Sequence, residues 1–79
     1  MKVNVRLFGA LETSIPGYKP STGLEVEMRE GATVKELLFL LNLLRHAGLA
    51  IVRDGRILKA DEEIHPGDGL CLIQAVHGG

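Results

Sequence analysis

A single segment with a helical pattern lies between segments with strand patterns, and this order leaves few folds open to a chain of 79 residues. Apolar residues recur at helical spacing after Thr33, whereas residues 2–8 and 24–29 alternate apolar and polar side chains as strands do. One helix and several strands in a small domain are typical of an α+β fold in which the helix covers one face of a sheet. We therefore expect a single domain over residues 1–79.

The stretch between the first two predicted strands, residues 9–23, is rich in turn-forming residues. It contains Pro16-Gly17 and Pro20-Ser21-Thr22-Gly23, and it has neither a helical nor a strand period. We expect a long connection that is ordered by Ile15 and Tyr18, whose side chains would lie on the body of the domain.

The helix is predicted to begin after Thr33 and to end near Arg45 or His46. Thr33 and Glu36 have the spacing of a capping box, in which the threonine hydroxyl accepts from the N–H of Glu36 and the glutamate side chain accepts from the N–H of Thr33. Gly48 can then end the helix in the left-handed conformation.

The predicted helix is apolar on more than one side. One broad arc is expected to face the core, and it comprises Val34, Leu37, Leu38, Leu41 and Leu44. Phe39 and Leu43 fall nearly opposite the centre of this arc. Two explanations are open: either the connection over residues 9–23 covers them, or they form a surface for a partner or for self-association.

Three further strands are predicted after the helix. Residues 49–53 and 56–59 flank Asp54-Gly55, which suits a type I′ hairpin because both central residues of that turn need positive φ. Residues 64–69 form the next turn, and residues 70–76 form the last strand.

The last strand is apolar on both sides. Leu70, Leu72 and Gln74 are expected to point to one side, and Cys71, Ile73 and Ala75 to the other. If Leu70 and Leu72 pack under the helix, Cys71 and Ile73 lie on the open face of the sheet.

Composition and charge exclude several classes of function. Nine basic and ten acidic side chains give a net charge of −1, and Lys and Arg do not cluster, so we expect no nucleic-acid partner. The longest apolar run, residues 37–41, is too short to span a membrane. The first residues carry no signal-peptide pattern, and the single cysteine, Cys71, excludes an internal disulfide. We expect a cytoplasmic protein.

Polar residues show no pattern of a metal centre or a catalytic site. His46, His65 and His77 lack the spacing of metal ligands, so we expect no metal on this chain. Six of the ten acidic residues fall in two groups, Asp61-Glu62-Glu63 and the set of Glu25, Glu27 and Glu30. They either face solvent or steer a basic partner.

The order and length of these elements resemble the β-grasp fold. The ending Gln74-Ala75-Val76-His77-Gly78-Gly79 resembles the tails of ubiquitin-like sulfur carriers, namely the small subunit of molybdopterin synthase and the sulfur carrier of thiamine synthesis. Residues 33–38 and Pro66-Gly67-Asp68 add to the resemblance. It implies a ubiquitin-like, mixed four- to five-stranded sheet with one main helix packed across one face. Residues 77–79 would then be a flexible C-terminal tail.

The resemblance implies a carrier protein and not an enzyme. In such carriers an E1-like adenylyltransferase uses ATP to activate the C-terminal carboxylate, here that of Gly79, and a persulfide protein then donates sulfur to form a thiocarboxylate. The acceptor would be the large subunit of molybdopterin synthase or thiazole synthase. The chain itself would bind no cofactor. Gly78 and Gly79 lack Cβ atoms, so this tail can enter a narrow channel.

A docking surface is expected beside this tail. The open side of the last strand would present an apolar patch to the partner enzymes, as in the family's complexes, and Phe8 can join it because it is out of phase with the buried side of its strand. The expected docking residues are Ile73, Ala75, Val76, His77 and Phe8.

The receiving pathway is predicted from the two ends of the chain. Residues 5–10 resemble the molybdopterin-synthase subunit, whereas residues 74–76 are closer to the thiamine carrier, and Arg53 stands where many relatives of both kinds have asparagine. We expect a carrier for molybdopterin (molybdenum or tungsten cofactor) synthesis. The alternatives are a thiamine-type carrier, a ubiquitin-like modifier joined through Gly79 to lysines, and an interaction domain with an idle tail.

Overall fold

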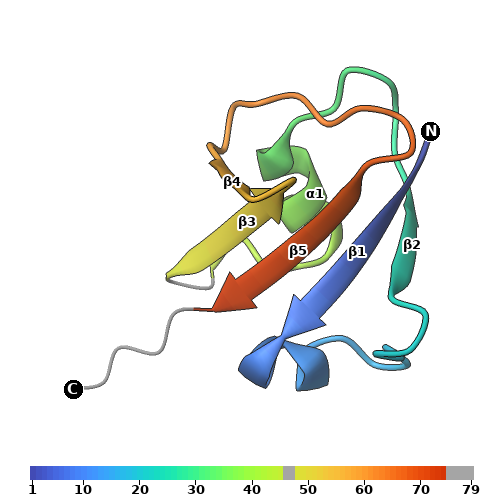
Figure 1. Cartoon of the computed structure of the whole chain (residues 1–79), viewed down its shortest axis with the longest axis vertical. Coiled ribbons are helices and arrows are strands. Elements are labelled where there is room, and N and C mark those ends of the chain that lie inside the picture. Colours follow the sequence, from blue (N-terminus) through green and yellow to red (C-terminus); the bar gives the residue numbers. More distant parts are fainter. Residues whose placement is uncertain (46–47, 75–79) are drawn as a thin grey trace.

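The computed structural model describes residues 1–45 and 48–74. Its elements are β1 (Lys2–Phe8), the 3₁₀ helix η1 (Gly9–Thr13), β2 (Leu24–Glu27), α1 (Val34–Leu40), β3 (Leu49–Arg53), β4 (Arg56–Leu58) and β5 (Gly69–Gln74). The strands form one mixed sheet in the order β2-β1-β5-β3-β4. The central strands β1 and β5 run parallel and side by side, and α1 lies across one face of the sheet (Figure 1). The predicted α+β architecture with five strands and one helix is confirmed.

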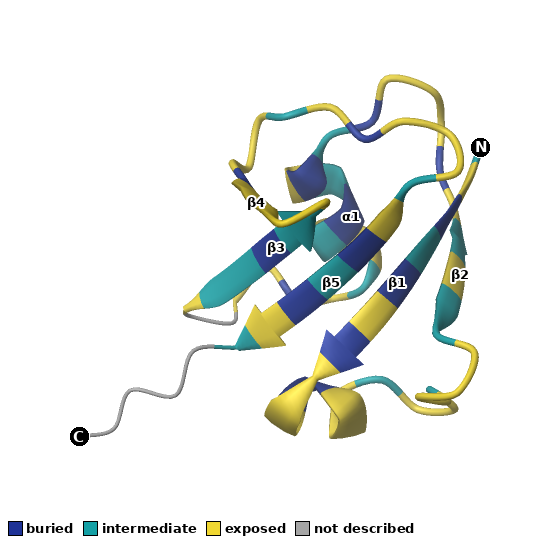
Figure 2. Ribbon diagram, in the orientation of Figure 1, coloured by how far each residue is buried: buried dark blue, intermediate teal, exposed yellow. Residues whose placement is uncertain are grey.

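The core lies between α1 and the sheet. Alternating side chains of β1 and β5 are buried, which gives the banded pattern of these strands in Figure 2. The buried members from these two strands are Val3, Val5, Leu7, Leu70 and Leu72. Burial of one such side chain stabilises the folded state by roughly 1.5–3 kcal/mol. The two central strands therefore contribute a large part of the stability of the sheet. The predicted inward sides of both strands are confirmed.

The connection over residues 9–23 lies on the body, as predicted. The Tyr18 hydroxyl accepts from the N–H of Leu7 at 2.8 Å and donates to the Leu7 carbonyl at 3.3 Å. The pairing of β1 with β2 extends only to Val5 and Leu24. The Tyr18 hydroxyl thus bonds the N–H and C=O groups of Leu7, which lies beyond that pairing. Leu11 in η1 is fully buried, and neither this 3₁₀ helix nor its anchoring leucine was predicted from the sequence.

The prediction that the helix ends near Arg45 or His46 was wrong: α1 ends at Leu40. Asn42 has φ 61°, and the N–H of Leu43 donates to the Leu38 carbonyl at 2.8 Å while that of Asn42 donates to the Phe39 carbonyl at 3.0 Å. These are the two hydrogen bonds of a Schellman motif, with asparagine in place of the usual left-handed glycine.

The early end of α1 reverses the expected places of two leucines. Because the chain turns at Asn42, the helical period no longer applies after it, and Leu43 is buried in the core while Leu44 is 45% exposed. Leu43 is therefore part of the core and does not form a surface for a partner or for self-association. Phe39 stays 69% exposed.

The start of α1 follows the predicted cap in part. The Thr33 hydroxyl accepts from the N–H of Glu36 at 3.4 Å, as expected. The Glu36 carboxylate instead accepts from the guanidinium of Arg29, with a distance of 2.9 Å to its Nε. The return half of the capping box is thus replaced by an ion pair to the segment after β2.

The hairpin between β3 and β4 has the predicted turn. Asp54 and Gly55 have φ angles of 52° and 78°, the positive values that a type I′ turn requires. The resulting register pairs Arg53 with Arg56 and Val52 with Ile57. The hairpin thus carries Ile57 to the same side of the sheet as Val52.

Candidate functional site

The strand that leads to the C-terminus, β5, separates its side chains as predicted. Leu70 and Leu72 are buried under α1, whereas Ile73 on the opposite, open face is 42% exposed and Cys71 is half-buried. Gln74 is the last described residue of the chain. The exposed Ile73 is therefore separated by one residue, Gln74, from the final five residues of the chain.

Neighbouring strands extend this apolar surface on both sides of β5. The parallel register pairs Phe8 of β1 with Ile73, and the antiparallel register pairs Ala50 and Val52 of β3 with Ile73 and Cys71. Ile57 of β4 continues the row beyond Val52. We call this surface the open-face patch, and it comprises Phe8, Ala50, Val52, Ile57, Cys71 and Ile73.

The most exposed members of the open-face patch are large and apolar. Phe8 is 46% exposed and Ile57 is 66% exposed. Because large apolar side chains that are exposed together commonly mark an interaction site, the open-face patch is a candidate surface for contact with another protein. Arg6 is paired in register with Cys71, and its Nη1 donates to the Pro20 carbonyl at 3.1 Å. The patch therefore has an apolar centre with a polar residue at its border, as in protein interfaces.

The predicted docking residues are only partly described. The structure brings Phe8 and Ile73 together, as expected. Ala75, Val76, His77 and the two terminal residues Gly78 and Gly79 lie outside the described residues.

Three members of the open-face patch, Ala50, Val52 and Ile57, were not predicted. The sequence signal for Val52 and Ile57 is the two-residue Asp54-Gly55 loop. A type I′ hairpin with that loop pairs residue 52 with residue 57, which places the two side chains on the same side of the sheet.

Arg53 has a structural contact at the other end of β5. Its Nη1 lies 2.9 Å from Oδ2 of Asp68, and both side chains are about one-sixth exposed, at 15% and 16%. The same carboxylate accepts from the N–H of His65 at 2.8 Å, and Arg53 also donates to the Glu63 carbonyl at 3.2 Å. This network holds the turn that leads into β5, and it places Arg53 away from the patch residues next to Gln74.

Two further observations concern other kinds of site. Within residues 1–45 and 48–74, no group of three or more His, Cys, Asp or Glu side chains is arranged to hold a metal ion. No helix in that part of the chain is long and apolar enough to cross a membrane.

The sequence matches the ThiS family over residues 5–79. The chain belongs to the ThiS family of ubiquitin-like sulfur carriers. This confirms the resemblance that the Gly-Gly ending and the element order indicated. No curated protein matches the sequence.

Solved structures share the fold of this ThiS-family protein along nearly its whole length. SAMP1 from Haloferax volcanii matches with a TM-score of 0.76 and 20% identity over 100% of both chains. A putative molybdopterin converting factor, subunit 1, from Pyrococcus furiosus matches with a TM-score of 0.77 and 23% identity over 96% of this chain and 99% of that chain. A Caldiarchaeum subterraneum ubiquitin matches with a TM-score of 0.64 and 23% identity over 100% and 98%.

These likenesses confirm the β-grasp, ubiquitin-like fold. The family match makes the protein a carrier of the ThiS type. Carriers of the ThiS family are not themselves catalysts and bind no cofactor of their own.

Proposed function

We propose that this protein carries sulfur as a thiocarboxylate on Gly79 for molybdopterin synthesis. The observation that supports this most directly is the place of the open-face patch. Ile73 and Phe8 lie beside the end of β5, so a partner that covers them is within a few residues of the terminal Gly78-Gly79.

The chemistry begins with activation of the terminal carboxylate. A carboxylate is a poor electrophile, because its negative charge and its resonance both resist attack at carbon. An E1-like adenylyltransferase transfers AMP from ATP to the Gly79 carboxylate and releases pyrophosphate, which makes an acyl-adenylate with a good leaving group. ATP belongs to that enzyme, and this chain contributes only the carboxylate.

Sulfur then replaces AMP. The terminal sulfur of a persulfide on the donor protein attacks the carbonyl carbon, and AMP leaves. A second thiol attacks the cysteine sulfur of the resulting acyl disulfide and breaks the S–S bond that came from the persulfide. The thiol and that cysteine form a disulfide, and the thiocarboxylate is left on Gly79. The loaded carrier finally gives its sulfur to a synthase subunit.

The folded domain provides the surface by which partner enzymes bind the protein during these steps. Binding energy in protein interfaces concentrates in a few well-packed, apolar side chains, and Phe8 and Ile73 are large, exposed and adjacent. The tail residues Ala75, Val76 and His77 complete this docking surface in our proposal. The same surface would meet the activating enzyme and the sulfur acceptor in turn.

The proposed acceptor is the large subunit of molybdopterin synthase. Residues 5–10 resemble the small subunit of that enzyme, and the fold matches a putative molybdopterin converting factor subunit over 96% of this chain. Thiazole synthase of the thiamine pathway is the alternative acceptor, because residues 74–76 are closer to that carrier.

A protein modifier is the second candidate function. SAMP1 is a small archaeal modifier protein, and its fold matches over 100% of this chain. The same adenylate permits this outcome: a lysine amine of a target attacks the carbonyl carbon, the leaving group departs, and an isopeptide bond forms at Gly79.

Intact-mass analysis of the protein from its native host tests the proposal. We expect a fraction in which one oxygen is exchanged for sulfur, with the change confined to the C-terminal peptide. The loaded protein is then offered separately to the molybdopterin synthase large subunit and to thiazole synthase. Turnover only with thiazole synthase would overturn the pathway, and slower-migrating conjugates that need Gly79 would favour the modifier.

A further inference from the structure

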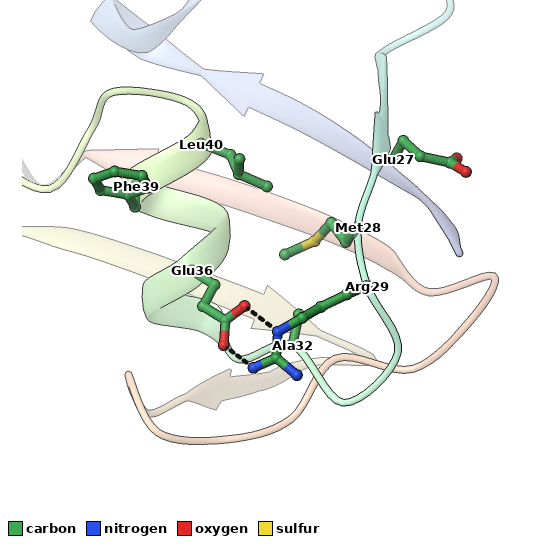
Figure 3. A pocket seen from close by; sticks show the side chains of 7 residues that line it. All are labelled: Glu27, Met28, Arg29, Ala32, Glu36, Phe39 and Leu40. Atoms are coloured by element: carbon green, nitrogen blue, oxygen red, sulfur yellow. Dashed lines mark hydrogen bonds and ion pairs between the residues drawn. The ribbon is translucent and has the colours of Figure 1, made fainter.

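A second apolar surface lies on the helix side of the sheet, away from the open-face patch. A groove of about 470 Å³ runs between the segment after β2 and α1. We call it the β2–α1 groove, and its lining residues are Glu27, Met28, Arg29, Ala32, Glu36, Phe39 and Leu40. Figure 3 shows Met28 directed toward the helix from the end of β2, with Leu40 directed toward it from the other wall.

The groove has an apolar floor and one exposed apolar wall. Met28 and Ala32 form the floor and are buried, at 4% and 0% exposed. Leu40 and Phe39 stand at the rim, and they are 55% and 69% exposed. Large apolar side chains that line a concavity in this way are typical of a binding surface.

Two of the three charged residues that line the groove, Arg29 and Glu36, pair with each other. Arg29 reaches across from the segment after β2 and donates to Glu36 of α1, as Figure 3 shows. The hydrogen bond and the negative charge of Glu36 raise the pKa of the Arg29 guanidinium. This ion pair compensates both charges and leaves Glu27 as the charged lining residue without an ion pair among the described residues.

The strand beside the groove has a free edge. β2 is the outermost strand and pairs only with β1. The N–H of Met28 donates to the Met1 carbonyl at 2.7 Å, so Met28 bonds toward β1. Because backbone groups alternate along an antiparallel strand, Val26 does the same, and Glu25 and Glu27 direct their N–H and C=O groups outward. An extended segment can form main-chain hydrogen bonds with these groups and add to the sheet as a further strand.

The side chains on this edge specify the charge of the segment. Glu25 and Glu27 are both exposed and lie on the side of β2 away from the core. Glu25 is in contact with Lys2 at 3.4 Å, and Glu27 has no cation within ion-pair distance among the residues that the structure describes. A second copy of this strand would bring like charges together, which destabilises strand pairing. A basic segment has the complementary charge.

We propose that the β2–α1 groove binds an extended segment of a partner protein in which apolar and basic residues alternate, added as a strand to the free edge of β2. Side chains alternate across a strand. The apolar ones would lie in the groove against Met28 and Leu40, and the basic ones would lie on the other side beside Glu25 and Glu27.

This inference goes beyond the proposed function, because it does not depend on Gly79. The groove and the open-face patch lie on opposite sides of the sheet, so both can be occupied together. A partner held in the groove would keep the carrier close while its tail is inside another enzyme, and this raises the effective concentration of the tail.

The test uses the full-length, isotope-labelled protein and two short capped peptides. In one peptide lysine and valine alternate, and in the other glutamate replaces each lysine. With the lysine–valine peptide we expect amide NMR shifts at Glu25, Glu27, Met28 and Leu40, and slower hydrogen exchange at the amides of Glu25 and Glu27. The glutamate–valine peptide is expected to produce neither effect.

Matched variants separate the groove from the rest of the surface. Leu40→Ser is expected to weaken lysine–valine binding about tenfold, because a leucine contact is lost from the interface. Phe39→Ser serves as a second groove variant, and Ile57→Ser is the control, since it removes an equally exposed apolar side chain from the opposite side of the sheet. The double variant Glu25→Lys, Glu27→Lys is expected to reverse the peptide preference.

Several results would overturn the inference. They are the absence of shifts at Glu25 and Glu27, shifts confined to the open-face patch, and equal binding of both peptides. A dimer in sedimentation that Leu40→Ser dissociates would make the groove an interface between copies instead. Deletion of Gly79 leaves peptide binding unchanged in our proposal, so failure here is distinguishable from failure of the tail chemistry.

Discussion

Phe8 and Ile73 are direct register partners on the parallel strands β1 and β5, and both are more than two-fifths exposed, at 46% and 42%. The residues just before them, Leu7 and Leu72, are also partners and are buried. The same pairing of strands thus builds the core on one face of the sheet and an apolar contact surface on the other. This surface lies at the end of β5, next to Gln74, the last described residue.

Phe8→Ala and Ile73→Ala should weaken binding to the activating enzyme while the fold stays intact. Each substitution removes a large exposed apolar side chain from the open-face patch. The loss of such a side chain from the centre of an interface commonly lowers affinity about tenfold or more. Titration calorimetry with the adenylyltransferase measures the effect. Phe39→Ala is the matched control, because it removes an exposed aromatic ring from the helix side. Equal losses for all three variants would contradict a specific role of the patch.

Deletion of Gly79, or Gly79→Ala, should abolish sulfur loading without a change in thermal stability. Deletion moves the reacting carboxylate back by one residue, and alanine adds a Cβ atom to the residue that carries it. We expect a narrow channel in the activating enzyme to admit neither change. Mass spectrometry after incubation with ATP, the activating enzyme and a persulfide donor measures the loading. If the shortened chain still gains sulfur at its new terminus, the terminal glycine has no special role.

The strands and their facing were predictable because they depend on local period. The alternation in residues 2–8 identified β1 and its buried side. The exposed Ile73 followed in the same way from its phase against Leu72. The Asp54-Gly55 turn also sets the register that pairs Ile57 with Val52. The turn was predicted from the sequence, whereas this pairing was not.

The end of α1 and the place of Leu11 were not predictable from period alone. Apolar residues continue at helical spacing through Leu44, but a single left-handed residue, Asn42, redirects the chain. Asparagine has only a modest preference for that conformation. Leu11 belongs to a 3₁₀ helix of five residues, which is too short to show a period, so its burial depends on tertiary packing.

Asn42→Ala should destabilise the protein, and Asn42→Gly should not. The φ of 61° at this position costs a non-glycine residue with a Cβ about 1–2 kcal/mol, a cost that asparagine partly offsets and glycine avoids. Chemical denaturation with constant m-values measures the difference. Similar stabilities for the alanine and glycine variants would show that the Schellman turn does not hold Leu43 in the core.

Arg53→Met should destabilise the protein by about 1–2 kcal/mol. This value is below that of a fully buried pair, because solvent still reaches Arg53 and Asp68. Loss of the arginine leaves the Asp68 carboxylate largely desolvated with only the His65 N–H as a described partner. The control is Lys2→Met, which removes a pair whose side chains are 70% and 66% exposed and should cost at most about 0.5 kcal/mol. Equal losses would mean that the Arg53 pair is no more than a surface contact.

Glu62 should contribute to the dependence of stability on acid pH. The N–H of Lys59 donates to its carboxylate at 2.7 Å, and this bond, with the nearby charge of Arg56, lowers the pKa of Glu62 below its ordinary value of 4.5. The folded state therefore releases the proton more readily than the unfolded state does. Its stabilisation is complete above pH 4.5 and is lost as the pH falls through the lower folded-state pKa.

The variant Glu62→Gln isolates this contribution, because glutamine keeps the shape and an acceptor oxygen but does not titrate. We expect the free energies of unfolding of the two proteins to differ near neutral pH and to converge as the pH falls below 4.5. Thermal unfolding across this range measures the convergence. A constant gap between parent and Glu62→Gln would mean that the carboxylate acts through packing rather than through its charge.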